Sequence, residues 1–206
     1  MGKKGVLFDL DGVLLDSEGT YYEFWDSIAR EYKVGVPNFA YAIKGTNMTS
    51  ILSHFTKEEQ AEIIQKHTDF QNKMKFSFFP GAIDFVKRLA EKGIPRCVVT
   101  SSEEAKMSQL YGQHPYFPAL FDAIITGDMV EHGKPNPECF LKGAAAIHCD
   151  IKDCYVFEDS IQGSQAGLAA GATVVGLCTT YPMDKVAQLA HKVLPSLSCA
   201  TEDIIS

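Results

Sequence analysis

Acidic residues gather directly behind a short apolar run near the start of the chain, in the stretch GVLFDLDGVLLD. Asp9 and Asp11 are separated by one residue, and Asp16 follows five positions after the second of them. In an extended backbone the side chains of residues i and i+2 point the same way. Two carboxylates that close repel each other unless a cation lies between them or one of them keeps a proton. The first pair is therefore a candidate for metal binding or for acid and base chemistry.

Two simpler interpretations fit this stretch less well. A calcium-binding EF-hand loop also opens with D-x-D, but its fifth and sixth positions would be Val13 and Leu14, and its terminal acid would be Thr20. An ordinary turn explains Asp and Gly after a strand, yet it does not require two acids on one side of the chain. The pattern therefore favours a chemical role for the pair.

Hydroxyl residues form a second cluster, after the apolar run Ile94–Val99. Thr100 and Ser101 stand first in it, and Ser101 with Glu104 fits a capping box, which predicts the start of a helix. A helix N-terminus that carries hydroxyl groups and free backbone N–H groups can also bind an anion. The cluster is thus a candidate phosphate site.

Two more clusters carry a lysine and an acidic pair. Lys134 lies in the stretch HGKPNPE, where prolines on either side of an asparagine stiffen the loop and a proline after the lysine excludes a Walker A motif. Glu158 and Asp159 close another apolar run and precede a segment of helical length. Each cluster alone could be solvated surface or a helix cap. Their shared position, just after predicted strands, is what gives them weight.

The segments that carry these clusters alternate between strand and helix. Short apolar runs predict five buried strands, at Gly5–Phe8, Ile94–Val99, Ala123–Thr126, Cys154–Phe157 and Thr173–Leu177. Helical periodicity predicts helices at Gly81–Lys92, Glu138–Ile147 and Ile161–Ala170. This alternation predicts an α/β fold, a Rossmann-like three-layer parallel sheet covered by helices on both faces. Ligands bind at the carboxyl ends of the strands of such sheets, so the four clusters should meet at one edge.

The span between the first strand and Gly81 breaks the alternation. From Glu18 to about Lys75 the only periodicity is helical, and the apolar stripe of the first predicted helix is expected to be packed core. We predict a small α-helical cap domain at 17–79, inserted after the first strand. Residues 1–16 and 80–206 would form the Rossmann-like catalytic core.

Composition and charge narrow the class of protein. A net charge of -7 argues against a nucleic-acid partner, because such proteins are usually basic. The six cysteines include no C-x-x-C pair, which favours reduced thiols and a cytoplasmic location. Apolar runs are too short to span a bilayer, and acids interrupt the first of them too early for a signal peptide. We expect neither a nucleic-acid nor a membrane partner, and a monomer, with a dimer as the alternative.

Together the four clusters resemble the motifs of the haloacid dehalogenase (HAD) superfamily of phosphotransferases. The stretches that carry the resemblance are DLDGVLLDSE, VVTSS, GKPNPECF and FEDSIQGSQAG. The resemblance covers nearly the whole chain and is strongest to the subgroup with a helical cap, which includes sugar-phosphate phosphatases and β-phosphoglucomutase. It implies a phosphoric monoester hydrolase that acts on a small phosphorylated metabolite, such as a sugar phosphate, through an aspartyl-phosphate intermediate.

The resemblance also implies a role for each motif residue. Asp9 would be the nucleophile. Asp11 would be the general acid and base, a task for which its pKa should be raised. Thr100 and the backbone N–H of Ser101 would bind the phosphoryl oxygens. Lys134 would neutralise charge on the nucleophile and the phosphoryl group.

The implied cofactor is Mg²⁺. The carboxylates of Asp9 and Asp159 and the backbone carbonyl of Asp11 would bind it, with Glu158 as a direct or water-mediated partner. A hard dication prefers such oxygen ligands and accepts phosphate as a further one.

The cap departs from the mutase pattern. β-Phosphoglucomutases place an arginine in a K-G-x-x-R stretch, where it holds the distal phosphate of a bisphosphate; here Met48 stands at that position. A thioether cannot replace a bidentate guanidinium, so we favour a phosphatase over a mutase. Lys44, Thr46 and Asn47, in the same stretch, are the candidate substrate contacts of the cap.

Three alternatives stay open. They are a β-phosphoglucomutase-type phosphomutase, an inorganic pyrophosphatase of the same fold, and a catalytically silent binding module. All the motif acids and Lys134 are present, which argues against the silent module.

Overall fold

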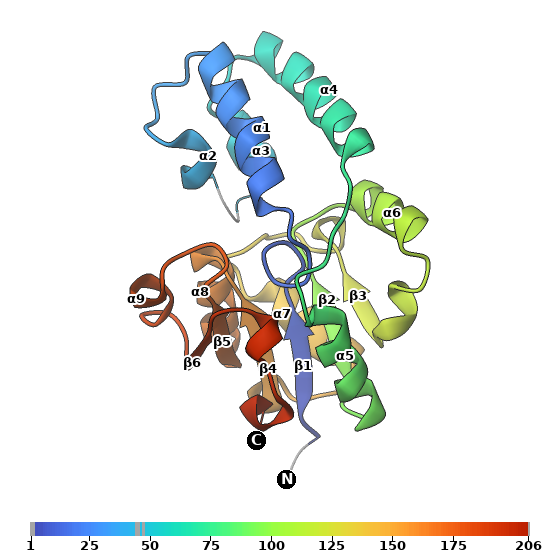
Figure 1. Cartoon of the computed structure of the whole chain (residues 1–206). Coiled ribbons are helices and arrows are strands. Elements are labelled where there is room, and N and C mark those ends of the chain that lie inside the picture. Colours follow the sequence, from blue (N-terminus) through green and yellow to red (C-terminus); the bar gives the residue numbers. More distant parts are fainter. Residues whose placement is uncertain (1–2, 44–45, 47, 206) are drawn as a thin grey trace.

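The computed structural model describes residues 3–43, 46 and 48–205. Its centre is a six-stranded, all-parallel sheet in the order β3-β2-β1-β4-β5-β6 (Figure 1). The strands are β1 (Gly5–Phe8), β2 (Arg96–Val99), β3 (Ala123–Ile125), β4 (Cys154–Glu158), β5 (Thr173–Leu177) and β6 (Lys192–Leu194). The predicted α/β fold class is confirmed. The sixth strand was not predicted, because its three residues are only half-buried and give no apolar run.

Alternate strand residues pack against helices on opposite faces of the sheet. Phe8 stacks on Phe157 with ring centroids 5.1 Å apart, on the face covered by α5 (Ala82–Glu91) and α6 (Glu104–Gln113). Leu7 points to the other face, where α7 (Glu138–Ala146) and α8 (Ile161–Ala170) lie. Because both faces are covered, the strands are apolar throughout, and polar side chains are left for their ends.

Four helices stand above the carboxyl ends of the strands (Figure 1). They are α1 (Glu18–Glu31), α2 (Phe39–Ala42), α3 (Met48–Leu52) and α4 (Lys57–Lys73). They share an apolar core of their own, in which Trp25, Ile28 and Ile63 are buried. The division into a cap at 17–79 and a core made of 1–16 and 80–206 stays our proposal.

Two linkers join these helices to the sheet. The backbone N–H of Asp16 donates to the carbonyl of Ser77, and Leu15 forms a bridge with Phe78, so the outgoing and returning segments pair with each other. Asp16 itself is exposed. Its place in the linker separates it from the other two acids of the first cluster.

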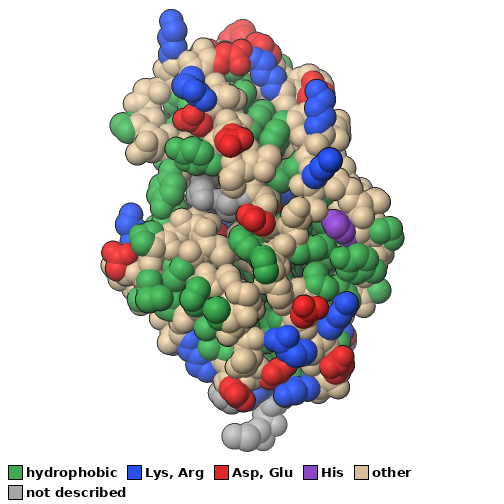
Figure 2. Space-filling view, in the orientation of Figure 1, with side chains coloured by type: hydrophobic (Ala, Val, Ile, Leu, Met, Phe, Trp, Pro, Cys, Tyr) green, Lys and Arg blue, Asp and Glu red, His purple; other side chains and the backbone are tan. Residues whose placement is uncertain are grey.

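The remaining described elements are short helical segments. The short helix α9 (Met183–Val186) follows β5, and five 3₁₀ segments lie at Pro118–Leu120, Gly127–Met129, Ile151–Asp153, Leu197–Cys199 and Glu202–Ile205. Among the helices of the described residues, none combines the length and apolar character needed to cross a bilayer. On the face seen in Figure 2, acidic and basic side chains are interspersed.

Candidate active site

The carboxyl ends of β1, β2 and β4 bring the four sequence clusters to one edge of the sheet. Asp9 directly follows β1, Thr100 follows β2, and Glu158 ends β4. Lys134 reaches the same place from the loop before α7. Since β1 and β4 are neighbours from which the chain winds in opposite directions, this is the switch point of the sheet, where parallel α/β proteins bind ligands.

Lys134 is the buried cation at the centre of this edge. Its Nζ lies 2.5 Å from Asp9 Oδ1 and 2.7 Å from Glu158 Oε1, and it also donates to the carbonyl of Val99 at 3.2 Å. Burial disfavours its charge, but the Asp9 and Glu158 carboxylates more than offset this and hold the pKa of Lys134 above its usual range. Lys134 is therefore a fixed positive charge beside Asp9.

Three buried carboxylates surround that one ammonium group. Oxygen atoms of Asp9, Glu158 and Asp159 all lie within 4.8 Å of one another. Burial raises the pKa of Asp9, the Glu158 charge raises it further, and Lys134 only partly opposes the two. An excess of buried negative charge held on oxygen atoms fits a hard divalent cation.

The two acids of the Glu158-Asp159 pair are held differently. Glu158 Oε2 accepts hydrogen bonds from the backbone N–H groups of Asp159 and Ser160, at 3.0 and 2.9 Å, and from the Ser160 hydroxyl, while Oε1 faces Lys134. Asp159 Oδ2 accepts from the Thr180 hydroxyl. With donors on both of its oxygens, Glu158 suits a water-mediated contact to a cation better than a direct one.

Two glycines make room for these carboxylates. A Cβ on Gly12, whose φ is +81°, would lie 2.0 Å from Asp159 Oδ2, and a Cβ on Gly163 would lie 1.7 Å from Glu158 Oε1. Sequence reasoning did not single out either glycine. The available signals were a glycine directly after D-x-D and another at the third position of the helix that follows the acidic pair.

Asp11 lies in different surroundings. Its carboxylate accepts from the hydroxyls of Ser17 and, at 2.9 Å, Ser102, and Lys106 Nζ lies 2.6 Å from both of its oxygens. Burial alone would raise the pKa of Asp11, but the charge and hydrogen bonds of Lys106, aided by the two hydroxyls, lower it. The expectation of a raised pKa is thus wrong for this arrangement, and the reason is a partner 95 positions away that the local sequence did not reveal.

In the hydroxyl cluster after β2, Thr100 is buried and Ser101 is half-buried, and neither side chain caps a helix. Thr100 is 3% exposed, and its Oγ1 accepts from the backbone N–H of Ser102 at 3.0 Å. The predicted capping box of Ser101 and Glu104 is wrong: α6 has Glu103 at its N-cap, and the N–H of Glu104 donates to the Asp128 carboxylate. The turn before the helix therefore carries Thr100 and Ser101 at the strand end.

The candidate substrate contacts of the cap are only partly described. Lys44 and Asn47 lie outside the described residues. Thr46 donates from its hydroxyl to the carbonyl of Ile43 at 2.6 Å. Met48 begins α3 and packs against the apolar core of the cap.

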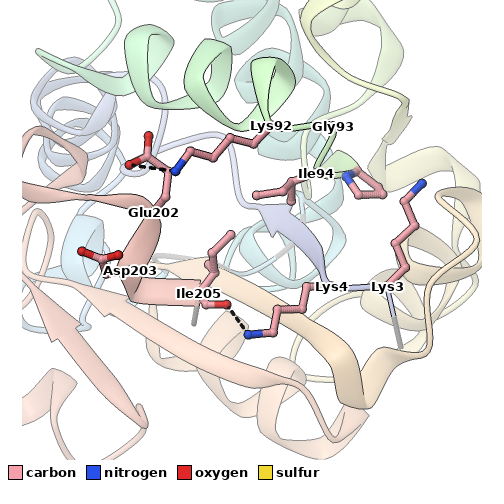
Figure 3. A pocket seen from close by; sticks show the side chains of 9 residues that line it. Lys3, Lys4, Lys92, Gly93, Ile94, Glu202, Asp203 and Ile205 are labelled. Atoms are coloured by element: carbon pink, nitrogen blue, oxygen red, sulfur yellow. Dashed lines mark hydrogen bonds and ion pairs between the residues drawn. The ribbon is translucent and has the colours of Figure 1, made fainter. Parts of the chain in front are cut away.

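A separate cavity of about 390 Å³ lies at the opposite end of the sheet (Figure 3). Lys3 and Lys4 precede β1 in its wall, and two of its lysines are engaged with the C-terminal segment: Lys4 donates to the carbonyl of Ile205 at 2.9 Å, and Lys92 lies 3.9 Å from Glu202. Because Lys3 and Lys4 precede β1 and Lys92 precedes β2, this cavity lies at the amino ends of these strands, remote from the carboxylates that follow them.

Comparison with known proteins agrees with this geometry. The family model of haloacid dehalogenase-like hydrolases matches residues 6–177. Hexitol phosphatase A of Escherichia coli is 31% identical over 182 residues, covering 84% of this chain and 82% of that protein. Fructose-1-phosphate phosphatase of the same organism is 31% identical over 185 residues, covering 83% and 94%. A crystal structure of β-phosphoglucomutase from Clostridium difficile superposes with a TM-score of 0.80 at 22% identity, covering 100% and 96%, and shows the same fold.

The chain belongs to the haloacid dehalogenase-like hydrolase family. Its relatives place it among the phosphoric monoester hydrolases of that family.

Proposed function

We propose that the protein is a Mg²⁺-dependent phosphatase that hydrolyses a small phosphorylated metabolite, a sugar phosphate being the favoured class. The observation that carries the proposal is the position of Asp9, which lies beside a buried ammonium and within 4.8 Å of two other buried carboxylates. Sugar phosphates are favoured because hexitol phosphatase A and fructose-1-phosphate phosphatase are similar along most of the chain.

In the proposed reaction Asp9 attacks phosphorus as the nucleophile. The new bond joins a carboxylate oxygen to phosphorus while the ester P–O bond breaks, and Asp11 gives a proton to the leaving oxygen. Asp11 then takes a proton from a water molecule, which attacks phosphorus and releases Asp9 and phosphate. Lys134 offsets the repulsion between the Asp9 carboxylate and the anionic phosphate, and Thr100 with the Ser101 N–H holds the phosphoryl oxygens.

Asp9, the backbone carbonyl of Asp11 and Asp159 are the residues that would hold the metal ion, with Glu158 contacting it through water. When bound, Mg²⁺ supplies positive charge that neutralises the phosphoryl oxygens during transfer. The pre-existing excess of carboxylates over lysine at this edge is the feature of the chain that supports a dication.

Hydrolysis is favoured over mutase activity because of Met48. The residue packs into the apolar core of the cap, and a thioether offers no charge to a second phosphate. The six cysteines are free thiols, which supports a reducing, cytoplasmic location.

The test is a panel of phosphorylated metabolites assayed for phosphate release with Mg²⁺ and with a chelator. We expect metal-dependent release, with hexose and hexitol phosphates among the best substrates. Interconversion of glucose 1-phosphate and glucose 6-phosphate without phosphate release would instead show a mutase, and selective release from pyrophosphate would show a pyrophosphatase. No turnover of any member, with intact fold, would contradict the proposal.

A further inference from the structure

Two adjacent threonines that follow β5 reach the acidic edge of the sheet and take no part in the proposed reaction. The Thr180 hydroxyl donates to Asp159 Oδ2, and the Thr179 hydroxyl donates to the backbone carbonyl of Gly12. Asp159 Oδ2 also packs against Gly12, because a Cβ built on this glycine would lie only 2.0 Å from that oxygen. The two hydroxyls therefore hold the two sides of one contact: the carboxylate, and the backbone of the turn after Asp11.

The segment that carries the threonines is anchored at both of its ends. The backbone N–H of Cys178 donates to the carbonyl of Leu194 in β6 at 3.0 Å, and Tyr181 is 6% exposed. The Tyr181 ring also contacts Tyr41 of the cap helix α2, with ring centroids 5.1 Å apart. Because the chain is fixed on either side of them, the two hydroxyls are held in place relative to the sheet.

The charges around Asp159 explain why its carboxylate benefits from such a bond. Oxygen atoms of Asp9, Glu158 and Asp159 lie within 4.8 Å of one another, and Lys134 pairs with the first two of these residues. Like charges this close repel, and the repulsion favours rotation of the Asp159 side chain away from the other carboxylates. The Thr180 hydroxyl opposes that rotation, because it holds one of the two carboxylate oxygens.

We propose that Thr180 is a positioning residue for the metal ion and that it acts through Asp159. The inference rests on the proposed function, in which Asp159 is a ligand of Mg²⁺. A hydrogen bond to a ligating carboxylate fixes its orientation before the ion binds, so less freedom is lost on binding. Without the hydroxyl, Asp159 relaxes away from its neighbours, and the free energy needed to bring it back reduces the affinity for the ion.

The experiment measures the dissociation constant of Mg²⁺ in the absence of substrate, from the rise of the melting temperature with Mg²⁺ concentration. Thr180→Val keeps the shape of the side chain and removes the hydroxyl, and it should raise the dissociation constant about 10-fold or more. Thr180→Ser keeps the hydroxyl and should stay within about 2-fold of the wild-type value. Thr201→Val, an exposed threonine that precedes Glu202 at the other end of the sheet, is the matched control and should leave the constant unchanged.

Phosphate release from the best substrate of the panel gives a second readout. In Thr180→Val the Mg²⁺ concentration that gives half of the maximal rate should rise by the same factor as the dissociation constant. The rate at saturating Mg²⁺ should stay within about 3-fold of the wild-type rate, because the bound ion holds Asp159 in place once the site is filled.

The outcomes separate a positioning role from a merely structural one. An unchanged dissociation constant in Thr180→Val would overturn the inference, and a lower melting temperature without metal would then show that the hydroxyl only stabilises the fold. Equal losses of affinity in Thr180→Val and Thr180→Ser would also overturn it, because the hydroxyl would not be responsible. If Thr180→Val does not fold, Thr180→Ala takes its place in the same comparison.

The same measurements distinguish failure of this inference from failure of the proposed function. A wild-type protein whose melting temperature and phosphate release do not respond to Mg²⁺ would contradict the proposed function itself. A wild-type response to Mg²⁺, with unchanged affinity in Thr180→Val, would count only against the role of Thr180.

Discussion

Asp9 and Asp11, which are separated by a single residue, have opposite electrostatic surroundings in this protein. The Asp9 group comprises Asp9, Lys134, Glu158 and Asp159, three carboxylates with one ammonium. The Asp11 group comprises Asp11, Lys106, Ser17 and Ser102, one carboxylate with one ammonium and two hydroxyl donors. The first group is short of positive charge and the second is balanced. Burial, with the charge of Glu158 adding to it, raises the pKa of Asp9, whereas Lys106 outweighs burial and lowers the pKa of Asp11.

The difference shows how one short motif can serve two tasks. Two acids this close in the sequence would repel each other in isolation, but each pairs with its own buried lysine, Lys134 or Lys106, from a different part of the chain. The Asp9 group can accept a dication together with a phosphate, and the Asp11 group can stabilise the ionised form of an acid that has given up its proton. Four experiments test the difference between the two groups.

The largest effect is expected from Asp9→Asn. The amide keeps the shape of the side chain but cannot attack phosphorus, so kcat should fall more than about 10⁴-fold while the fold is retained. Asp16→Asn, the third acid of the same stretch, is exposed in the linker and should change kcat less than about 2-fold. Phosphate-release kinetics measure the turnover of both variants, and circular dichroism checks that they are folded. Near-normal turnover in Asp9→Asn would show that Asp9 is not the nucleophile.

Gly12→Ala tests whether the backbone of the first motif makes room for the metal ligands. Its Cβ would lie 2.0 Å from Asp159 Oδ2, so Asp159 must move, and we expect about a 100-fold loss of kcat/KM together with more than about 2 kcal/mol of stability. Gly171→Ala is the matched control: its φ is +87°, but a Cβ there meets nothing within 4 Å. It should cost only about 1 kcal/mol from backbone strain and leave activity unchanged.

If the two variants lost activity equally, the positive φ rather than the Asp159 contact would be responsible. Enzyme kinetics and urea denaturation of both proteins distinguish these outcomes.

Mg²⁺ should stabilise the folded protein through the carboxylates of the Asp9 group and independently of the Asp11 side chain. At about 100 times its dissociation constant, a ligand that binds only the native state adds about 2.7 kcal/mol of stability. We expect Mg²⁺ to raise the melting temperature of the wild-type protein by an amount that corresponds to this stabilisation. The rise should be lost in Asp159→Asn and kept in Ser102→Ala, which alters only the Asp11 group. A shift abolished equally by both variants would show that the two groups are not separate in their response to the metal.

The smallest effect is expected from His67 of α4, which stacks on Trp25 with ring centroids 5.5 Å apart. Burial, with the charge of Lys106 adding to it, lowers the pKa of His67 to about 4, from 6.5. Below pH 6.5 His67 is protonated in the unfolded state but stays neutral in the folded state. The free energy of unfolding therefore falls as the pH falls, and the loss is complete near pH 4. The contribution lost between pH 7 and pH 5 is about 2 kcal/mol.

Denaturant unfolding of the wild-type protein and of His67→Phe at pH 7 and pH 5 measures this contribution of His67 to stability. The pH-dependent difference between the two proteins should be about 2 kcal/mol, whereas parallel pH dependences would show that His67 is neither buried nor sensitive to Lys106.

Much of the fold followed from the sequence because its signals are local. Gly5–Phe8, Thr173–Leu177 and Ile161–Ala170 begin and end at the predicted residues, since apolar runs and helical periodicity are interrupted there by polar residues or glycine. The start of α6 was predicted two residues early, with the N-cap at Ser101 in place of Glu103. The first N–H group of the helix, that of Glu104, donates to Asp128, 24 positions along the chain, and no local capping pattern could show that.

The residues that follow the strands could be predicted from the sequence, because in a parallel sheet the chain order of strands and helices places the carboxyl ends of all strands at one edge. Which carboxylate pairs with which lysine depends on the three-dimensional packing and could not be predicted. Lys106 sits with Met107 and Leu110 on the buried face of α6, a place where a lysine is unusual but whose partner cannot be read from spacing. Its bond to Asp11 spans 95 positions, and a Coulomb interaction depends on distance in space and on burial, which packing alone sets.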